Sequence, residues 1–280
     1  NEPVALSYQD WSTDWFPPMA REMLSRFYAF NPNIIVFYTP DPDDLGETML
    51  EEMRAGTAPD VLQGCCTFFP IWAQGGHLLD LRPFIERDLD EELLSEWDRA
   101  QYEALATADG LQYGLPKFHG ALALYYNKDL FDAHGIPYPD ETWTQDEYLD
   151  AMRRLTLDED GDGATDVWGG MIDVSWDRVQ VHVNAWGGNI VDPDDPASCA
   201  LDEDPALEAV EWLRARMWDD KFMATLLDVQ NLSTRDAFIE GAVATVEDGS
   251  WALKDILANA PFRVGVAPLP AGPAGRVTLA

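Results

Sequence analysis

The sequence predicts an α/β protein with two lobes. Short runs rich in β-branched and aromatic residues alternate with segments whose apolar residues recur at helical spacing, up to the end of the chain. No internal repeat or low-complexity tract interrupts the alternation. The 280 residues are enough for one large or two modest domains with proper cores. Because 46% of them are hydrophobic and 11% aromatic, a disordered acidic tail is excluded.

The chain opens with a predicted strand, helix and strand. The first strand is expected at residues 6–8. A helix then begins at Pro17 and Pro18, where a missing backbone N–H costs nothing, and ends before Asn31. The continuous apolar run at residues 34–38 is typical of a buried strand.

A second helix and a short strand follow. Leu45, Met49 and Met53 recur at i, i+4 and i+8, which predicts a helix that Gly56 ends. Residues 61–62 begin the next short strand.

The second half of the chain repeats the alternation. Residues 121–126 read as a strand, and Thr144-Gln-Asp-Glu147 is a capping box that starts a helix. This helix places Tyr148, Met152 and Leu155 on one face.

Four more elements complete the prediction. Asp204-Pro205 opens a helix. Residues 242–246 and 263–267 read as strands, separated by a helix that starts near Ser250.

The charge balance restricts the partners. The chain has 18 Lys and Arg against 51 Asp and Glu, a formal net charge of −33. Such a surface repels phosphate backbones and anionic lipid, so no nucleic-acid partner is expected, whereas a neutral or cationic small ligand remains open. No run of eighteen apolar residues is present, so no transmembrane helix is predicted.

The cysteines and the first residues leave the compartment open. The three Cys are the adjacent Cys65 and Cys66 and the distant Cys199, which excludes a disulfide scaffold and leaves one long-range bridge to Cys199 as an alternative. The sequence starts at Asn1 without a basic and apolar leader, which fits a mature secreted chain or a trimmed one.

One acidic loop resembles half of a calcium site. Its four carboxylates are Asp158, Asp160, Asp162 and Asp166. Counted from the first, Gly163 is sixth, as in an EF-hand loop, but Gly169 takes the twelfth position instead of the bidentate Glu. We expect a structural calcium ion held by these four carboxylates. The alternative is a solvated acidic turn.

Nine local patterns carry a family resemblance. In order they are Gly56-Thr-Ala-Pro-Asp-Val61, Gln74-Gly-Gly-His-Leu-Leu-Asp-Leu81, Asp109-Gly-Leu-Gln-Tyr-Gly-Leu-Pro116, Leu124-Tyr-Tyr-Asn-Lys-Asp-Leu-Phe131, Gly135-Ile-Pro137, Thr142-Trp-Thr144, Trp186-Gly-Gly188, Ala237-Phe-Ile-Glu-Gly-Ala-Val-Ala-Thr245 and Gly249-Ser-Trp251. In this order and spacing, across roughly the whole chain, the sequence resembles the extracellular solute-binding proteins of carbohydrate ABC importers, the maltose-binding-protein-like family.

The resemblance implies a fold and a function. The fold would be periplasmic-binding-protein-like, with two α/β lobes joined by a hinge and the ligand cleft between them. Residues 1–117 would form lobe I, with 268–280 as the start of a return segment, and 118–267 would form lobe II. Family members continue beyond Ala267-Pro-Leu-Pro-Ala-Gly272, so the C-terminal part is expected to be missing.

By the same resemblance, the chain would be the substrate-binding component of an ABC importer. It would capture a sugar or oligosaccharide by hinge closure and deliver it to the permease subunits. We expect a periplasmic or extracellular monomer, free or lipid-anchored at the cell surface, that needs no cofactor.

The candidate ligand-binding residues follow from sugar chemistry. Sugars need flat aromatic platforms for their C–H faces and polar groups for their hydroxyls, and the chain has eleven Trp. Trp11 and Trp15 lie beside Asp10 and Asp14 in a loop after the first strand, where α/β sheets place ligands. The alternative is that one of these tryptophans fills a core.

The resemblance adds candidates from the matching loops: Cys66, Thr67, Phe118, His119, Trp176, Asp177, Trp186, Asp248 and Trp251. Trp251 occupies the Gly-x-Trp position that commonly stacks on the sugar in this family. The alternative role of Asp248 is to cap a helix. The alternative for Trp186 is packing in the core, and that for His119 is a structural hydrogen bond.

Three other functions are alternatives. A cationic solute such as a polyamine would make use of the negative charge, and a sensor ectodomain would share the same fold. A secreted glycan-acting enzyme is disfavoured because Gly-x-Ser-x-Gly, P-loop and His-Glu-x-x-His motifs are absent from the sequence. No catalytic residue is therefore assigned.

Overall fold

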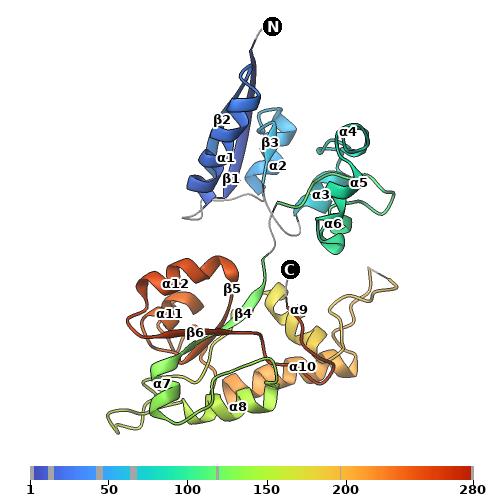
Figure 1. Cartoon of the computed structure of the whole chain (residues 1–280). Helices are drawn as coiled ribbons and strands as arrows, with labels where there is room; N and C mark the ends of the chain where they lie inside the picture. The colour runs from blue at the N-terminus through green and yellow to red at the C-terminus, as the bar shows by residue number, and fades with distance from the viewer. Residues whose placement is uncertain are drawn as a thin grey trace. The chain divides into compact units, whose positions relative to one another are not determined.

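The computed structural model describes residues 3–11, 16–41, 47–63, 68–117, 120–195 and 197–278, without the side chains of Trp11, Asp41 and Glu47. The chain divides into two compact units, Asn1–Lys117 and Phe118–Ala280 (Figure 1). The division falls at the residues where the sequence places the lobe boundary.

The first unit is built on a small parallel sheet. Its strands are β1 (Val4–Trp11), β2 (Ile34–Asp41) and β3 (Val61–Leu62), in the order β2-β1-β3. Helix α1 (Phe16–Phe30) connects β1 to β2 and buries Phe16 and Ala20. The predicted strand, helix and strand are thereby confirmed.

The apolar run in β2 is not a buried strand, contrary to the prediction. Its side chains alternate, with Ile35 and Phe37 exposed, the latter to 63%, and their neighbours partly covered. Figure 1 shows α1 running along the sheet formed by β1 and β2. Because successive side chains of a strand point to opposite faces, a run of apolar residues fills both faces whether or not both are covered.

The rest of the described first unit consists of helices joined by loops. The helices are α2 (Glu47–Ala55), α3 (Phe68–Gln74), α4 (Arg82–Asp88), α5 (Glu91–Ser95) and α6 (Arg99–Ala104). Trp72 on α3 is buried against Phe68 and Phe69, and the Tyr113 hydroxyl donates to the Ala104 carbonyl at 2.9 Å.

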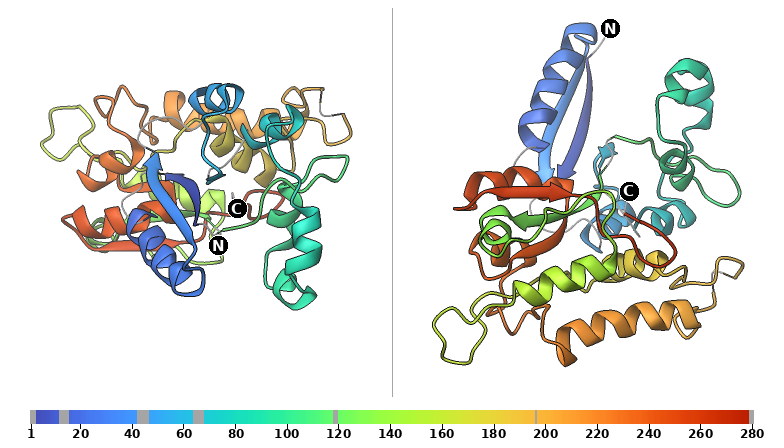
Figure 2. Two further views of the ribbon diagram at one scale, coloured as in Figure 1. Left: turned by 90° about the horizontal axis from the view of Figure 1, so that it is seen from above. Right: turned by 60° about the horizontal axis from the view of Figure 1, so that its bottom comes forward.

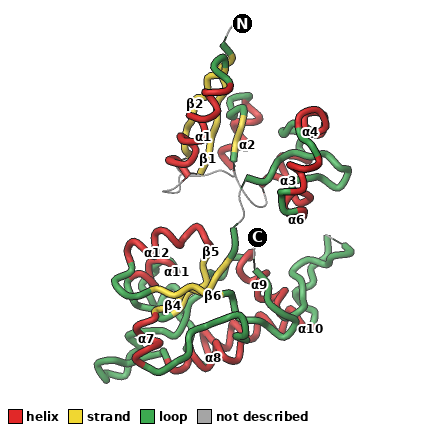
Figure 3. Tube along the Cα trace, in the orientation of Figure 1, coloured by secondary structure: helices red, strands yellow, loops and turns green. Residues whose placement is uncertain are grey.

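The second unit contains an antiparallel sheet in the order β5-β4-β6, covered on both faces (Figure 3). The strands are β4 (Leu122–Asn127), β5 (Thr245–Gly249) and β6 (Val264–Ala267), and the covering helices are α7 (Lys128–Ala133), α8 (Gln145–Arg154), α11 (Thr234–Ile239) and α12 (Leu253–Asn259). Leu124 packs with α7 and α8, whereas Tyr125 packs with α11 and α12. Figure 2 also shows α8 and α12 on opposite sides of the sheet.

The predicted capping box of α8 is present. The backbone N–H of Thr144 donates to the Glu147 carboxylate at 2.9 Å, and this helix buries Tyr148 and Met152 completely. The hydrogen bonds from Thr144 hold the pKa of Glu147 below its usual value.

The strand predicted at 242–246 begins three residues later. Residues 242–244 precede the strand and bond to Trp168: the Trp168 N–H donates to the Ala242 carbonyl at 2.9 Å, and the Ala244 N–H donates to the Trp168 carbonyl at 2.8 Å. Met171 then pairs with Val246. This extra segment brings the start of helix α9 (Trp176–Ala185) beside β5.

Residues 268–278 lie in the second compact unit. The family resemblance implies that they start a return to lobe I, and that return stays a prediction. The Gln145 N–H donates to the Ala271 carbonyl at 3.0 Å, and the Ala271 N–H donates to the Trp143 carbonyl at 2.8 Å. These backbone bonds pair the segment with the start of α8.

Two further helical segments lie outside the sheet. Helix α10 (Asp204–Arg214) starts at the predicted Asp204-Pro205, packs on α9 and continues as a π-helix, η1 (Ala215–Asp219). None of the helices in the described part of the chain has both the length and the apolar character of a membrane-spanning segment.

Candidate functional site

A pocket of about 350 Å³ opens on the second unit, at the end of β5. It is lined by Asp173, Arg178, Ser233, Thr234, Arg235, Glu247, Asp248 and Trp251. These residues come from the loop before α9, the first turn of α9, the start of α11, and the passage from β5 into the 3-10 turn Ser250–Ala252.

Trp251 supplies the aromatic side chain of the pocket. The indole folds back over the end of β5, so close that a Cβ on Gly249 would lie 2.1 Å from its ring atoms. A Cβ on Gly120 would lie 3.2 Å from the same ring. The glycine in the Gly249-Ser-Trp251 motif therefore has a steric cause.

Arg178 lies over this indole. Its guanidinium carbon is 5.1 Å from the ring centroid of Trp251, a cation–π contact. The side chain is only 13% exposed, and its ion pair with Asp177 is long, at 3.8 Å. Among the described residues, its Nε and Nη1 have no hydrogen-bond partner.

Arg235 and Asp248 form a paired wall of the pocket. Arg235 Nε lies 3.3 Å from an oxygen of the buried Asp248, and Arg235 Nη1 lies 3.6 Å from Asp255. The other Asp248 oxygen accepts the Gly249 N–H at 2.7 Å. Asp248 is therefore held by protein donors on both oxygens.

The hydroxyl of the buried Tyr125 donates to the Gly249 carbonyl, next to Asp248 in the chain, at 2.8 Å. Burial, and secondarily the charge of Asp248, raises the pKa of Tyr125 to about 12. Its phenol is therefore neutral at physiological pH.

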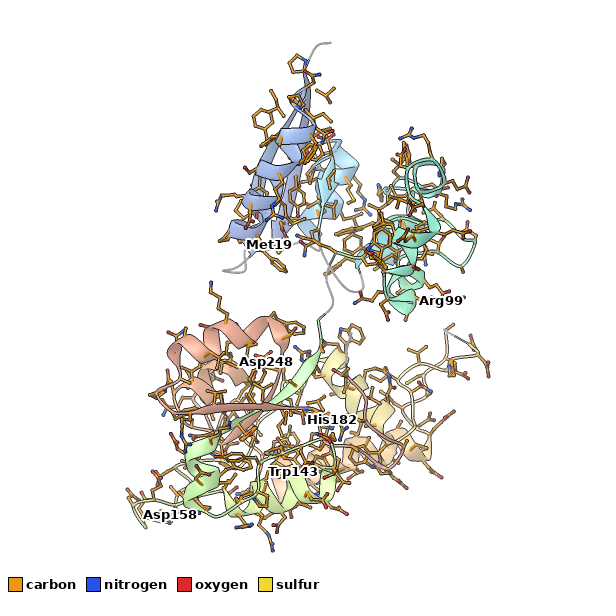
Figure 4. The ribbon with its side chains drawn as sticks, viewed as in Figure 1. Met19, Arg99, Trp143, Asp158, His182 and Asp248 are labelled. Atoms are coloured by element: carbon orange, nitrogen blue, oxygen red, sulfur yellow. The ribbon has the colours of Figure 1, made fainter. Side chains whose placement is uncertain are left out.

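Glu247 lines the pocket, and its carboxylate is held by a contact with a buried histidine. Its Oε2 lies 3.1 Å from Nε2 of His182, and both side chains are buried. Figure 4 marks His182 on α9 and Asp248 on β5. The His182 ring also stacks on Trp212 at 6.2 Å. Burial, and secondarily the charge of Glu247, raises the pKa of nearby Tyr148.

This pocket combines an aromatic ring with both kinds of hydrogen-bonding group. Guanidinium groups donate, carboxylates accept, and the hydroxyls of Ser233 and Thr234 do both. A polyhydroxylated ring needs this combination. The three carboxylates and two guanidinium groups leave one net negative charge on the wall.

The profile of the bacterial extracellular solute-binding protein family matches residues 10–278. The chain belongs to this family. An ABC substrate-binding protein of Listeria monocytogenes, solved in complex with cycloalternan, is 27% identical with a TM-score of 0.85, over 97% of this chain and 68% of its own. The maltodextrin-binding protein MdxE of Bacillus subtilis is 27% identical over 79% of this chain and 50% of its own length.

A binding protein of Brucella abortus is 27% identical over 92% of this chain and 61% of its own length. The chain thus spans less than two thirds of these curated relatives. Membership of the family confirms the predicted resemblance, the periplasmic-binding-protein-like α/β fold and the predicted class, a binding protein rather than an enzyme.

Two of the residues predicted to bind ligand meet in the pocket of this solute-binding protein, namely Asp248 and Trp251. Trp176, 58% exposed, and Asp177 start α9 next to Arg178, but neither lines the pocket. Trp186 packs at the end of α9, with its ring 5.6 Å from that of Trp212.

Several other predictions lie outside the described residues: Asp14, Trp15, Cys66, Thr67, Phe118, His119 and the side chain of Trp11. Their role in ligand binding stays a prediction.

Asp10 lies at the end of β1 in the first unit and has no exposed surface. Its carboxylate lies 2.8 Å from the Lys117 ammonium and accepts the Tyr8 hydroxyl at 2.9 Å. Lys117 also contacts the side-chain oxygen of Gln63, just after β3. Burial, and then Asp10, raises the pKa of Tyr8. This placement favours a structural role for Asp10 over the predicted ligand contact.

The acidic loop gathers three of its four predicted calcium ligands. Carboxylate oxygens of Asp158, Asp160 and Asp166 lie within 4.8 Å of one another on the exposed surface. Asp162 is outside this group, and its Oδ1 accepts the Ala164 N–H at 2.7 Å. Figure 4 shows Asp158 well away from His182 and Asp248. Calcium binding stays a prediction, and its site is separate from the pocket.

Six residues that line the pocket were not predicted from the sequence: Asp173, Arg178, Ser233, Thr234, Arg235 and Glu247. Arg178 directly follows Trp176 and Asp177, which were predicted to bind ligand, and this proximity is the only sequence signal that could have indicated it. Arg235 follows the N-cap Ser233 of α11, which by itself indicates only a helix start. No local pattern links either residue to Glu247.

Proposed function

We propose that this chain is the substrate-binding component of an ABC importer and that it takes up a sugar or oligosaccharide. The observation that carries the proposal is the pocket in which Trp251 stands beside Arg178 and Glu247. Membership of the solute-binding family supports it, as do the names of two relatives, one maltodextrin-binding and one solved with cycloalternan.

The proposed function is reversible binding of a sugar without a chemical reaction. An indole packs against the C–H face of a pyranose, while guanidinium and carboxylate groups exchange hydrogen bonds with its hydroxyls. The binding energy would favour a closed state rather than lower a chemical barrier. Hinge closure of the two lobes remains the mechanism that the sequence predicts.

The proposal extends to partners and location. The family is extracellular, and we place this chain outside the cytoplasmic membrane, in the periplasm or at the cell surface with a lipid anchor as the alternative to a free chain. Its partners would be the carbohydrate ligand and the permease subunits, and it would act as a monomer.

A thermal-shift panel tests the proposal. The chain is screened against maltotriose, mannotriose, arabinotriose, spermidine and amino acids, with and without calcium. Because a ligand that binds only the folded state stabilises it, a rise in Tm with one sugar class supports the proposal. A rise with spermidine alone would replace the sugar by a cationic solute. Release of reducing ends from the oligosaccharides would mean an enzyme.

A further inference from the structure

Two arginines of the second unit have nearly the same surroundings. Arg178 lies 5.1 Å from the ring centroid of Trp251, and Arg216 lies 5.2 Å from that of Trp212. Each side chain is 13% exposed. Both guanidinium groups are therefore stacked on an indole and largely removed from water.

The two arginines differ in their partners. Arg216 has a close ion pair with Asp220 at 2.6 Å, and among its buried nitrogens only Nε lacks a hydrogen bond to the described residues. The Arg178 ion pair with Asp177 is 3.8 Å long, and within the same described part of the chain both Nε and Nη1 have no partner. Burying an incompletely paired guanidinium is costly, so a second partner is expected at Arg178.

The position of Arg178 indicates where that partner comes from. Arg178 lines the pocket, whereas Arg216 does not. Two of the carboxylates that line the pocket have partners: Asp248 pairs with Arg235, and Oε2 of Glu247 with His182, while Oε1 of Glu247 has no hydrogen-bond partner among the described residues. Because Nε and Nη1 are themselves buried, a molecule in the pocket would accept their hydrogen bonds after a small shift of the Arg178 side chain.

The charge of the wall indicates the chemistry of that molecule. Asp173, Glu247 and Asp248 outnumber the two arginines, and Arg235 is already paired on both sides, with Asp248 and Asp255. An added anionic group would therefore meet net negative charge. Neutral oxygen atoms accept hydrogen bonds from a guanidinium without this repulsion.

We propose that Arg178 is a ligand-binding residue that donates hydrogen bonds to hydroxyl oxygens of a neutral sugar packed beside Trp251. This inference rests on the proposed function of the chain. It assigns Arg178 to recognition and Arg216, its structural counterpart, to stability alone.

The test compares Arg178→Met with Arg216→Met by isothermal titration of the whole chain with maltotriose, mannotriose and arabinotriose, together with Tm. Methionine retains a flexible side chain that packs on the indole but removes every donor. We expect Arg178→Met to weaken sugar binding roughly tenfold to a hundredfold with little change in Tm. Arg216→Met should lower Tm and leave the affinity unchanged.

A second variant, Arg178→Lys, covers the case in which Arg178→Met does not fold. Lysine keeps the charge but lacks the planar group with its several donors, so weaker binding is again expected. Undiminished affinity in the folded Arg178 variants, with the wild type binding a sugar, overturns this inference and leaves the proposed function standing. A wild type that binds none of the three sugars overturns the proposed function and this inference with it.

Discussion

Nε2 of His182 lies 3.1 Å from Oε2 of Glu247, although 65 residues separate the two in the chain. His182 is on α9 and Glu247 on β5, and both side chains are buried. Because Glu247 also lines the pocket, this contact joins the packing of the second unit to its candidate binding surface.

The first prediction is that His182→Leu destabilises the second unit. Leucine fills a similar volume but leaves a buried carboxylate without its partner, which costs about 3 kcal/mol. Urea unfolding should show the loss, and Glu247→Gln in the same background should recover part of it because the charge is gone. His134→Leu, in an exposed turn, is the control. Equal stability of the two leucine variants would exclude the proposed cost.

The second prediction concerns Trp251. If the indole packs against the sugar, Trp251→Ala should lower the affinity by about 1–3 kcal/mol in isothermal titration. Trp218→Ala, on the exposed side of the π-helix, serves as the control and should bind as the wild type does. A fall in Tm with unchanged affinity would make Trp251 a packing residue.

The third prediction is an alkaline loss of stability caused by Tyr125. Its pKa is raised to about 12 in the folded chain, so the neutral phenol is the favoured folded form. The stabilising contribution is complete below pH 10, the usual pKa, and is lost as the pH rises toward 12.

Unfolding of Tyr125→Phe and wild type across pH 8–12 measures this effect. At pH 8 the variant should be less stable by about 1 kcal/mol, because it lacks the hydrogen bond to Gly249. Its disadvantage should shrink above pH 10. A constant difference across the range would contradict the shift.

The fourth prediction separates the acidic loop from the pocket. If calcium binds where the three carboxylates meet, it should raise the Tm of the wild type, and Asp160→Asn should abolish the rise. Asp162→Asn is the matched control, since Asp162 is outside the group. Persistence of the calcium effect in Asp160→Asn would place the ion elsewhere.

Local chemistry explains the parts of the fold that were predictable. Pro17, the capping box from Thr144 to Glu147 and the opening at Asp204 place helix starts within a residue or two, because capping depends on neighbours along the chain. Gly249 is also set by a neighbour along the chain, because a Cβ there would collide with the indole of Trp251. The sequence by itself therefore determined the order of elements, the family resemblance, and one aromatic and one acidic residue of the pocket.

Tertiary packing decided the rest. Asp10 was predicted from its loop position, but its carboxylate is buried against Lys117, 107 residues away. Arg178, Arg235 and Glu247 come together only because α9, α11 and β5 converge. The exposure of one face of β2 could not be predicted either, since an apolar run does not show whether a second layer covers it. A residue's charge and size are local properties, whereas its burial and its partner depend on which distant segment packs against it.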